Sequence, residues 1–355
     1  MDGSKESLLL VTTSKPRATA LGGSGSLATM RSLFLGALTL AVVACSALPA
    51  EAANRWIQTR APLNMAHQGG EDEFPSNTMY AFRKALRAGA DMLELDVGVT
   101  QDDKVVVMHD TTLDRTTNGS GPVAWKTLRQ VKRLDAAYWF APRAKDDHYS
   151  HDRPRRAYRF RGVATGRREP PKGSRAADFR VPTLTDVLKA FPRTPITVEI
   201  KGRTPSEAVE EYVRNAEMVA RPLRKTMRRD LIVFSFQQAA VDRFHELVPA
   251  IDVAHGFTGA ANWLAGGSPG PGVVALQVPI IFRYAGTPIE VTTADNVARA
   301  HREGYAWQTW FSADDSDAPA SWRRLIDMCV DGIMTSRPRA LEQVLRAHER
   351  PASCN

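Results

Sequence analysis

Short apolar runs alternate with amphipathic stretches along most of the chain, from about Trp56 onward. The apolar runs are rich in β-branched residues and predict strands at 63–66, 92–97, 105–108, 196–200, 231–234, 273–278, 306–310 and 332–335, with a weaker candidate at 251–254. Helical periodicity fills most of the intervals, at 78–88, 184–190, 205–220, 237–247, 294–302 and 321–328. This alternation predicts a parallel sheet covered by helices, and about eight such units over roughly 290 residues favour a TIM-like (β/α)8 barrel.

Two places interrupt the alternation. Only residues 98–104 separate two of the predicted strands, which is too few for the crossover that joins parallel strands. We therefore expect a hairpin that turns at Asp102 and Asp103, in a register whose partner numbers sum to 205, with His109 opposite Asp96. The second interruption, at about 111–180, is rich in Arg, Pro, Gly and Tyr. It predicts a basic cap segment inserted over one rim of the barrel.

The first 52 residues have the pattern of a targeting segment. Residues 1–29 form a polar extension, and residues 30–52 contain one arginine followed by twelve largely apolar residues, too short to span a bilayer comfortably. Residues 50–52 offer a small-x-small cleavage site, whereas residues 42–45 (VVAC) resemble a bacterial lipobox ending at Cys45. Cleavage, lipidation and an uncleaved anchor all predict export, with the protein secreted or anchored on the outer face of the membrane. The barrel domain is expected over 56–350.

Composition and charge exclude several classes of protein for this chain. The 355 residues are 43% hydrophobic, which allows a large buried core and excludes collagen-like, coiled-coil and disordered chains. The net charge is +8, and a surplus of seven basic residues lies between Arg143 and Arg180. A local surplus does not indicate nucleic acid binding; a solvated loop and an anionic membrane surface both account for it. Export would allow a disulfide between Cys329 and Cys354, but we expect a buried free thiol at Cys329.

Carboxylates occur in pairs on two predicted strands. Glu94 and Asp96 are two residues apart and therefore share a face of their strand, as do Glu199 and Lys201. Three carboxylates that point into one space repel one another unless a positive charge lies among them, and Ca²⁺ or Mg²⁺ is the simplest counter-charge. A buried ion-pair network centred on Lys201 is the alternative.

Two histidines end apolar strands. His67 and His109 would face the catalytic side of a barrel, where the strands end. One imidazole that accepts a proton and another that donates one, beside a cation, suit the cleavage of a phosphate ester. His255 also follows an apolar run but lacks an accompanying motif, and we expect it to be structural.

These residues resemble the signature of the glycerophosphodiester phosphodiesterase family. The resemblance runs in order over nearly the whole exported part, through the motifs HQG at 67–69, SNT at 76–78, ELDV at 94–97, HD at 109–110, LDRTT at 113–117, EIK at 199–201 and DGIMTSRP at 331–338. It implies a TIM-like barrel with a cap and divalent-cation-dependent hydrolysis of glycerophosphodiesters to glycerol 3-phosphate and an alcohol. By position it implies the following roles: His67 and His109 as the acid/base pair, Glu94, Asp96 and Glu199 as metal ligands, and Gln68, Lys201 and Trp310 as substrate contacts.

Two positions depart from the family pattern. Gln68 stands where the family usually has an arginine, and Ser76 stands where it usually has a glutamate. The two losses compensate if that arginine and glutamate pair; otherwise Glu71 or Glu73 is the candidate replacement carboxylate. We expect an active enzyme with altered substrate preference. The alternatives are a phospholipase D-like hydrolase of lysophospholipids or other lipids, and a catalytically silent module that binds phosphate ligands.

Overall fold

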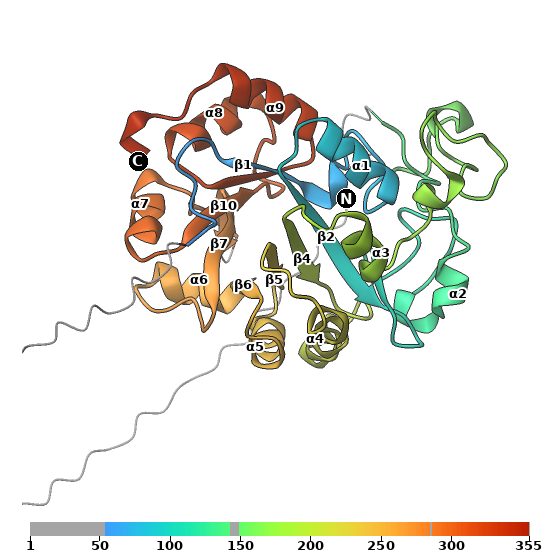
Figure 1. Ribbon diagram of the computed structural model, residues 1–355, viewed down its shortest axis with the longest axis horizontal. Helices are drawn as coiled ribbons and strands as arrows, with labels where there is room; N and C mark the ends of the chain where they lie inside the picture. The colour runs from blue at the N-terminus through green and yellow to red at the C-terminus, as the bar shows by residue number, and fades with distance from the viewer. Residues whose placement is uncertain (1–53, 143–148, 285, 355) are drawn as a thin grey trace, which may run out of the picture. The chain divides into compact units, whose positions relative to one another are not determined.

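A closed barrel of eight parallel strands forms the centre of the protein (Figure 1). The computed structural model describes residues 54–142, 149–284 and 286–354; the predicted targeting segment, with Cys45, lies outside them. Neighbouring strands follow the order β1-β11-β10-β7-β6-β5-β4-β2, and pairing of β1 with β2 closes the barrel. These strands are β1 (Leu63–Ala66), β2 (Met92–Val99), β4 (Ile196–Ile200), β5 (Leu231–Phe234), β6 (Asp252–Ala254), β7 (Val273–Pro279), β10 (Ala306–Trp310) and β11 (Gly332–Thr335).

Helices surround the barrel, as Figure 1 shows. Each strand is followed, directly or after an inserted segment, by a helix, which confirms the predicted TIM barrel. The helices are α1 (Met79–Arg87), α3 (Leu184–Ala190), α4 (Val209–Leu223), α5 (Gln238–Leu247), α6 (Phe257–Leu264), α7 (Ala294–Arg302), α8 (Pro319–Asp327) and α9 (Pro338–Ala347). Helix α1 begins where the Thr78 hydroxyl accepts a hydrogen bond from the Ala81 N–H, so the SNT motif supplies its N-cap.

The side chains of β2 show how the barrel positions chemistry. Leu93, Leu95 and Val97 point outward into the core between strands and helices, whereas Met92 belongs to a cluster that fills the barrel interior with residues of β1, β5 and β11. Because side chains alternate along a strand, Glu94 and Asp96 share the inward face with Met92 and lie further toward the carboxyl end. The interior is therefore apolar in its lower layer and acidic above it.

The predicted hairpin is present, but its register differs by one residue. Strand β3 (Val105–Val107) pairs antiparallel with β2 in a register whose partner numbers sum to 204, with Val97 opposite Val107. The predicted sum of 205 is wrong because the turn has three residues: Thr100 pairs with Lys104, and Asp103 takes the left-handed conformation with φ 55°. The backbone carbonyl of Asp96 therefore accepts a hydrogen bond from the Met108 N–H, and His109 lies one position beyond Met108.

The insertion after β3 has a packed aromatic core and is more than a solvated loop. It contains only short helices among its described residues: η2 (Val123–Trp125), α2 (Leu128–Val131), η3 (Arg155–Ala157) and η4 (Ala176–Phe179). Phe179 is fully buried and stacks on Tyr80 of α1 at 4.5 Å, and Phe160 lies 5.2 Å from the same ring. The exposed surface carries the basic side chains Arg155, Arg156, Arg159, Arg167, Arg168, Lys172, Arg175 and Arg180.

Further elements depart from the sequence expectation. An exposed hairpin of β8 (Ile281–Tyr284) and β9 (Thr287–Glu290) follows β7 and was not predicted, nor were α2, α6 and α9. The expected free thiol at Cys329 is wrong, because Cys329 forms a disulfide with Cys354, which is in η5 (Ala352–Cys354). Across the described ranges, no helix is long and apolar enough to cross a bilayer.

Candidate active site

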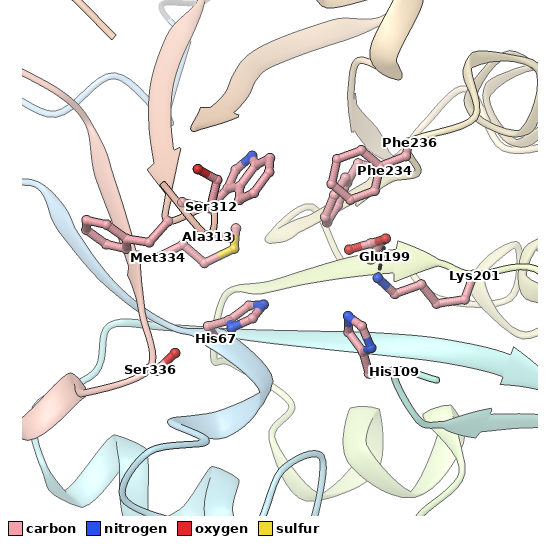
Figure 2. A pocket seen from close by; sticks show the side chains of 12 residues that line it. His67, His109, Glu199, Lys201, Phe234, Phe236, Ser312, Ala313, Met334 and Ser336 are labelled. Carbon is pink, nitrogen blue, oxygen red and sulfur yellow. Dashed lines mark ion pairs between the residues drawn. The ribbon is translucent and has the colours of Figure 1, made fainter. Parts of the chain in front are cut away.

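A cavity of about 280 Å³ opens at the carboxyl ends of the barrel strands (Figure 2). One part of its wall is polar, with His67, His109, Glu199 and Lys201. The facing part is apolar and comes from the ends of β5, β10 and β11 and the segments that follow them. The remaining lining residues are Phe234, Phe236, Trp310, Phe311, Ser312, Ala313, Met334 and Ser336. The structure thus brings both predicted histidines, Glu199, Lys201 and Trp310 to one cavity.

Each of the two histidines is oriented by a carboxylate. The Nδ1 atom of His67 lies 2.7 Å from Glu71 Oε1, and the Nδ1 atom of His109 lies 2.7 Å from Asp110 Oδ1. A partner on Nδ1 fixes the ring and leaves Nε2 as the atom that can exchange a proton with a ligand. Figure 2 shows the two rings side by side in the cavity. Each histidine is therefore positioned for acid or base chemistry through one nitrogen.

Glu71 also sets the charge state of His67. Burial alone would lower the pKa of His67, but the nearby carboxylates of Glu71, Glu94 and Asp96 outweigh it and raise this pKa to about 10. The pKa of Glu71 is lowered in turn: burial opposes the shift, and the His67 and Arg115 charges produce it. At neutral pH the pair is therefore an imidazolium and a carboxylate.

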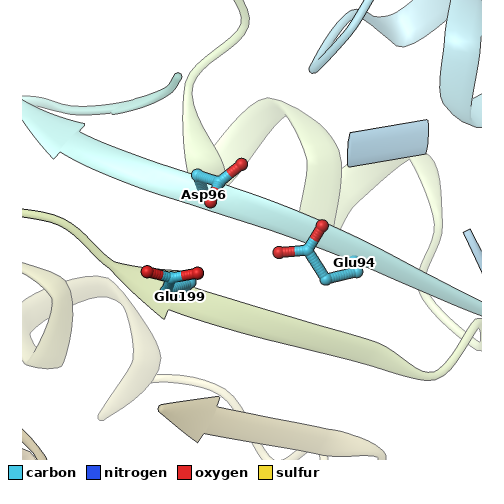
Figure 3. A group of neighbouring side chains, drawn as sticks. All are labelled: Glu94, Asp96 and Glu199. Carbon is cyan, nitrogen blue, oxygen red and sulfur yellow. The ribbon is translucent and has the colours of Figure 1, made fainter. Parts of the chain in front are cut away.

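Three buried carboxylates lie close to one another (Figure 3). Glu94 and Asp96 project from β2, and Glu199 projects from β4, where it is the register partner of Asp96. Glu94 and Asp96 are fully buried and Glu199 is 5% exposed, and one oxygen from each lies within 4.8 Å of the others. The predicted acidic cluster is thus assembled by two adjacent parallel strands.

The positive charge of Lys201 does not neutralise the three carboxylates of this cluster. Lys201 Nζ lies 2.5 Å from Glu199 Oε1 and 3.2 Å from Asp96 Oδ1, so the predicted alternative of a lysine-centred ion pair is also present. Burial, followed by the charge of Asp96, raises the pKa of Glu94 well above its ordinary value. Burial and then Asp96 also raise the pKa of Glu199, although Lys201 opposes this shift. One ammonium does not balance three buried carboxylates.

The donor set fits a divalent cation. Among the described residues, one buried oxygen of each carboxylate, Glu94 Oε1, Asp96 Oδ1 and Glu199 Oε1, has no hydrogen-bond partner, although Lys201 forms ion pairs with the last two. Three carboxylate oxygens converging from rigid strands are the ligands that Mg²⁺ and Ca²⁺ prefer. The residues present therefore suit a hard divalent cation held by Glu94, Asp96 and Glu199.

Comparison with known proteins agrees with this geometry. The model of the glycerophosphoryl diester phosphodiesterase family matches residues 67–340. The chain belongs to this family. It is 26% identical over 323 residues to the glycerophosphodiester phosphodiesterase of Bacillus subtilis (strain 168), covering 90% of this chain and 99% of that protein.

Two further relatives extend the comparison. YhdW of the same organism is 35% identical over 191 residues, which are 54% of this chain and 63% of YhdW, so the match spans somewhat less than two thirds of that relative. An Oleispira antarctica phosphodiesterase, solved in complex with the product sn-glycerol-3-phosphate, has a TM-score of 0.54 and 18% identity, with 81% of this chain and 97% of that chain covered. That likeness concerns the fold.

The two departures from the pattern of the glycerophosphoryl diester phosphodiesterase family contact each other. The Ser76 hydroxyl donates a hydrogen bond of 2.5 Å to Gln68 Oε1, and the Gln68 N–H donates to Glu94 Oε2 at 2.6 Å. Gln68 is 2% exposed and is not among the residues lining the cavity. Its predicted contact with substrate stays a prediction, whereas the contact between positions 68 and 76 is what a pairing of the family's arginine and glutamate would require.

Neither acidic residue considered as a replacement for the missing carboxylate occupies that place. Glu71 pairs with His67, and Glu73 lies near the Arg339 N–H, which is 3.4 Å from Glu73 Oε2. His255 is structural, as expected: it is buried, with Nδ1 at 2.9 Å from the Gly256 carbonyl, and Nε2 accepts the Gln277 N–H.

The sequence analysis did not identify two residues of the site in this chain. Glu71 and Asp110 hold the two histidines, and neither was singled out for that role. Their signal is proximity in sequence: Asp110 follows His109 directly, and Glu71 lies four residues after His67, across the short helix η1 (His67–Gly69). A carboxylate within one turn of a candidate histidine is thus worth testing as its orienting partner.

Proposed function

We propose that the protein is an exported, metal-dependent phosphodiesterase that hydrolyses glycerophosphodiesters to glycerol 3-phosphate and an alcohol. The observation that carries the proposal is the presence of two carboxylate-oriented histidines at one cavity with a buried acidic triad, whose member Glu199 lines that cavity. Family membership and the full-length match to the Bacillus subtilis enzyme support the same reaction. The proposal takes His67 and His109 as the proton-transferring residues because both line the cavity and each has a carboxylate on Nδ1.

The two histidines divide the proton transfers. His109, with Asp110 on Nδ1, would take the proton of the attacking nucleophile through Nε2. His67, which Glu71 favours in the protonated form, would give a proton to the oxygen of the departing alcohol. The alcohol then leaves neutral, so no alkoxide has to be released. Lys201 and Trp310 line the cavity and would contact the substrate.

Glu94, Asp96 and Glu199 would hold Mg²⁺ or Ca²⁺. When bound, such a cation withdraws charge from the phosphoryl oxygens. Lys201, whose pKa Glu199 and Asp96 raise against the effect of burial, stays protonated and supplies a second positive charge at the same wall. The carboxylates would thereby both bind the cation and orient Lys201.

The cavity favours a compact substrate. Its volume of about 280 Å³ lies near the lower end of typical small-molecule sites, about 300–1,000 Å³. A glycerophosphodiester with a small alcohol group therefore suits it. The apolar wall gives a specific reason for the second candidate, a lysophospholipid: Phe236 is 44% exposed and packs edge-on against Trp310 at 5.6 Å. An acyl chain would have to leave the cavity along these rings.

Export is supported by the disulfide. Disulfides persist in oxidising compartments and are rare in the cytosol, and Cys329 pairs with Cys354. The exposed arginines of the insertion would attract an anionic membrane surface, to which each basic residue near it contributes about 1 kcal/mol. Partner and location are thus part of the proposal.

The test is a substrate panel. Purified protein is incubated with glycerophosphodiesters that differ in the alcohol and with lysophospholipids, and release of glycerol 3-phosphate and of lysophosphatidic acid is measured. The proposal expects turnover of small glycerophosphodiesters that is lost in His67→Ala and in His109→Ala. Faster turnover of lysophospholipids would favour the second candidate. No turnover of any diester, with phosphate-ligand binding retained, would indicate a silent binding module.

A further inference from the structure

The carboxylate that orients His109 is itself held by an arginine. Arg115 makes a bidentate contact with Asp110, with Nε at 2.7 Å from Oδ2 and Nη2 at 2.9 Å from Oδ1. Asp110 Oδ1 is the atom that contacts His109 Nδ1. The Arg115 charge also lowers the pKa of Glu71, after the effects of burial, which opposes the shift, and of His67. A single guanidinium therefore fixes the carboxylate that orients His109, and its charge also favours the ionised form of Glu71.

Arg115 is not among the residues that line the cavity, and its side-chain hydrogen bonds go to Asp110. Its guanidinium is planar, and the paired contact fixes both the position and the rotation of the Asp110 carboxylate. That carboxylate in turn selects the nitrogen of His109 that carries the proton. Arg115 can thus influence the reaction only through the groups it holds.

The insertion keeps Arg115 in place. The Tyr149 ring lies 5.0 Å from the Arg115 guanidinium carbon, and the Tyr149 hydroxyl accepts the Ser76 N–H at 2.6 Å. Tyr149 is 3% exposed and packs against Phe140. His151 stacks on Trp139 at 3.9 Å, with its Nε2 at 3.3 Å from the Arg115 carbonyl. Two residues from the middle of the insertion, Tyr149 and His151, therefore contact Arg115 at its start.

We propose that Arg115 is a positioning residue that holds Asp110, the orienting carboxylate of His109, and that Tyr149 makes the inserted segment part of the catalytic machinery. The inference rests on the proposed acid/base roles of His67 and His109. It adds that the insertion contributes to the hydrolysis of small soluble substrates, in addition to any binding of a membrane surface.

The chain contains a matched control. Arg161 belongs to the same insertion and lies over three aromatic rings, those of Tyr138, Trp139 and Tyr158, at 4.3, 4.3 and 3.8 Å. Its Nε donates to the Tyr138 carbonyl at 3.0 Å. It therefore resembles Arg115 in its stacking but contacts neither orienting carboxylate. If stacked arginines in this segment only stabilise the fold, substitution of Arg115 and substitution of Arg161 should have the same effect on kcat.

The experiment compares Arg115→Gln, Arg115→Lys, Tyr149→Leu and Arg161→Gln by steady-state kinetics on a small glycerophosphodiester, with melting temperature measured for each. We expect Arg115→Gln to lower kcat about 10- to 100-fold, less than the roughly 10²- to 10⁴-fold contribution of an acid or base itself, with KM changed less than about threefold. Tyr149→Leu should lower kcat less, Arg115→Lys should recover part of the loss, and Arg161→Gln should keep kcat while lowering the melting temperature.

A double-mutant cycle separates positioning from general damage. If Arg115 acts largely through Asp110, Arg115→Gln should cost clearly less in an Asp110→Asn background than in the wild type. Additive losses, an unchanged kcat in Arg115→Gln, or an equal loss of kcat in Arg161→Gln would each overturn the inference.

One readout does not need turnover. In protein labelled with ¹⁵N-histidine, at a pH where His109 is neutral, the ring should carry its proton on Nδ1, and Arg115→Gln should mix the two tautomers whereas Arg161→Gln should not. An unchanged tautomer in Arg115→Gln overturns the inference. A wild type that shows the expected tautomers but hydrolyses no diester would instead contradict the proposed function.

Discussion

At the scale of single residues, the site depends on what lies behind each histidine. Glu71 and Asp110 are not among the residues that line the cavity, yet they decide which nitrogen of His67 and His109 faces it. The sequence predicted both histidines, because a polar residue at the end of a buried strand is conspicuous. It did not predict their partners, because the local turn that brings Glu71 back to His67 depends on Gln68 in the left-handed conformation, with φ 50°.

Glu71 gives a prediction about pH dependence. Its carboxylate favours the charged form of His67, so Glu71→Gln should lower the pKa of His67 from its raised value of about 10. If His67 donates a proton to the leaving group, its proton is then lost at a lower pH. The alkaline limb of the kcat/KM profile should therefore move to lower pH. Glu73→Gln is the matched control, since Glu73 lies near Arg339 rather than near a histidine. An alkaline limb that stays in place in Glu71→Gln would assign proton donation to another group.

Gln68 and Ser76 give a prediction about coupling. Their side chains meet at 2.5 Å, so Gln68→Arg alone would place a charge in a site that is 2% exposed without a carboxylate to meet it. An uncompensated buried charge costs about 3–5 kcal/mol, and we expect this single variant to lose activity and stability. Gln68→Arg with Ser76→Glu should do better than the sum of the two single effects in a double-mutant cycle. Strict additivity would mean that the two positions act independently.

At the scale of elements, the barrel and the places of its two interruptions could be predicted, but the register of the β2–β3 hairpin and the exposed β8–β9 hairpin could not. The buried strands are short runs of Val, Ile and Leu bounded by turns, and such runs are read directly from sequence. Strand β9 is exposed throughout and contains Pro288, so no apolar pattern marks it. The β2–β3 register failed for a different reason: Asp103 in the left-handed conformation adds one residue to the turn. The insertion has aromatic packing but little regular secondary structure, and periodicity does not detect that.

The surface of the insertion gives a prediction about membranes. Arg155, Arg156 and Arg159 are exposed, so changing all three to Gln should leave the melting temperature and cleavage of a small soluble diester unchanged. Binding to vesicles of anionic lipid should weaken, and its dependence on salt should flatten, because fewer charges are screened. Arg221, Arg224 and Lys225 near the end of α4 are equally exposed and provide the control triple variant. Equal weakening by both triple variants would point to net charge instead of this surface.

At the scale of the whole molecule, the disulfide ties the chain end to the barrel. Cys354 is 25 residues from Cys329, and a loop of this length is worth about 3 kcal/mol in the chain-entropy account. Arg350 adds two hydrogen bonds, to the carbonyls of Val330 and Cys329. We expect Cys354→Ser to lower the melting temperature by roughly 5–10 °C. Adding a reductant should lower the wild type to the same value and leave Cys354→Ser unchanged. A wild type insensitive to reductant would mean that the bond does not form in the purified protein.

The central claim joins the acidic triad, the histidines and phosphodiester cleavage in one site, and one measurement tests it most directly. Protein is stripped of metal with a chelator, its metal content is verified, and release of glycerol 3-phosphate from a small glycerophosphodiester is followed while Mg²⁺ or Ca²⁺ is added back. We predict almost no hydrolysis without the cation and saturable recovery with it, and in Glu199→Gln a recovery that needs a higher cation concentration, since one carboxylate ligand is lost. Full hydrolysis by the stripped protein, or an identical cation titration in Glu199→Gln, would contradict the account.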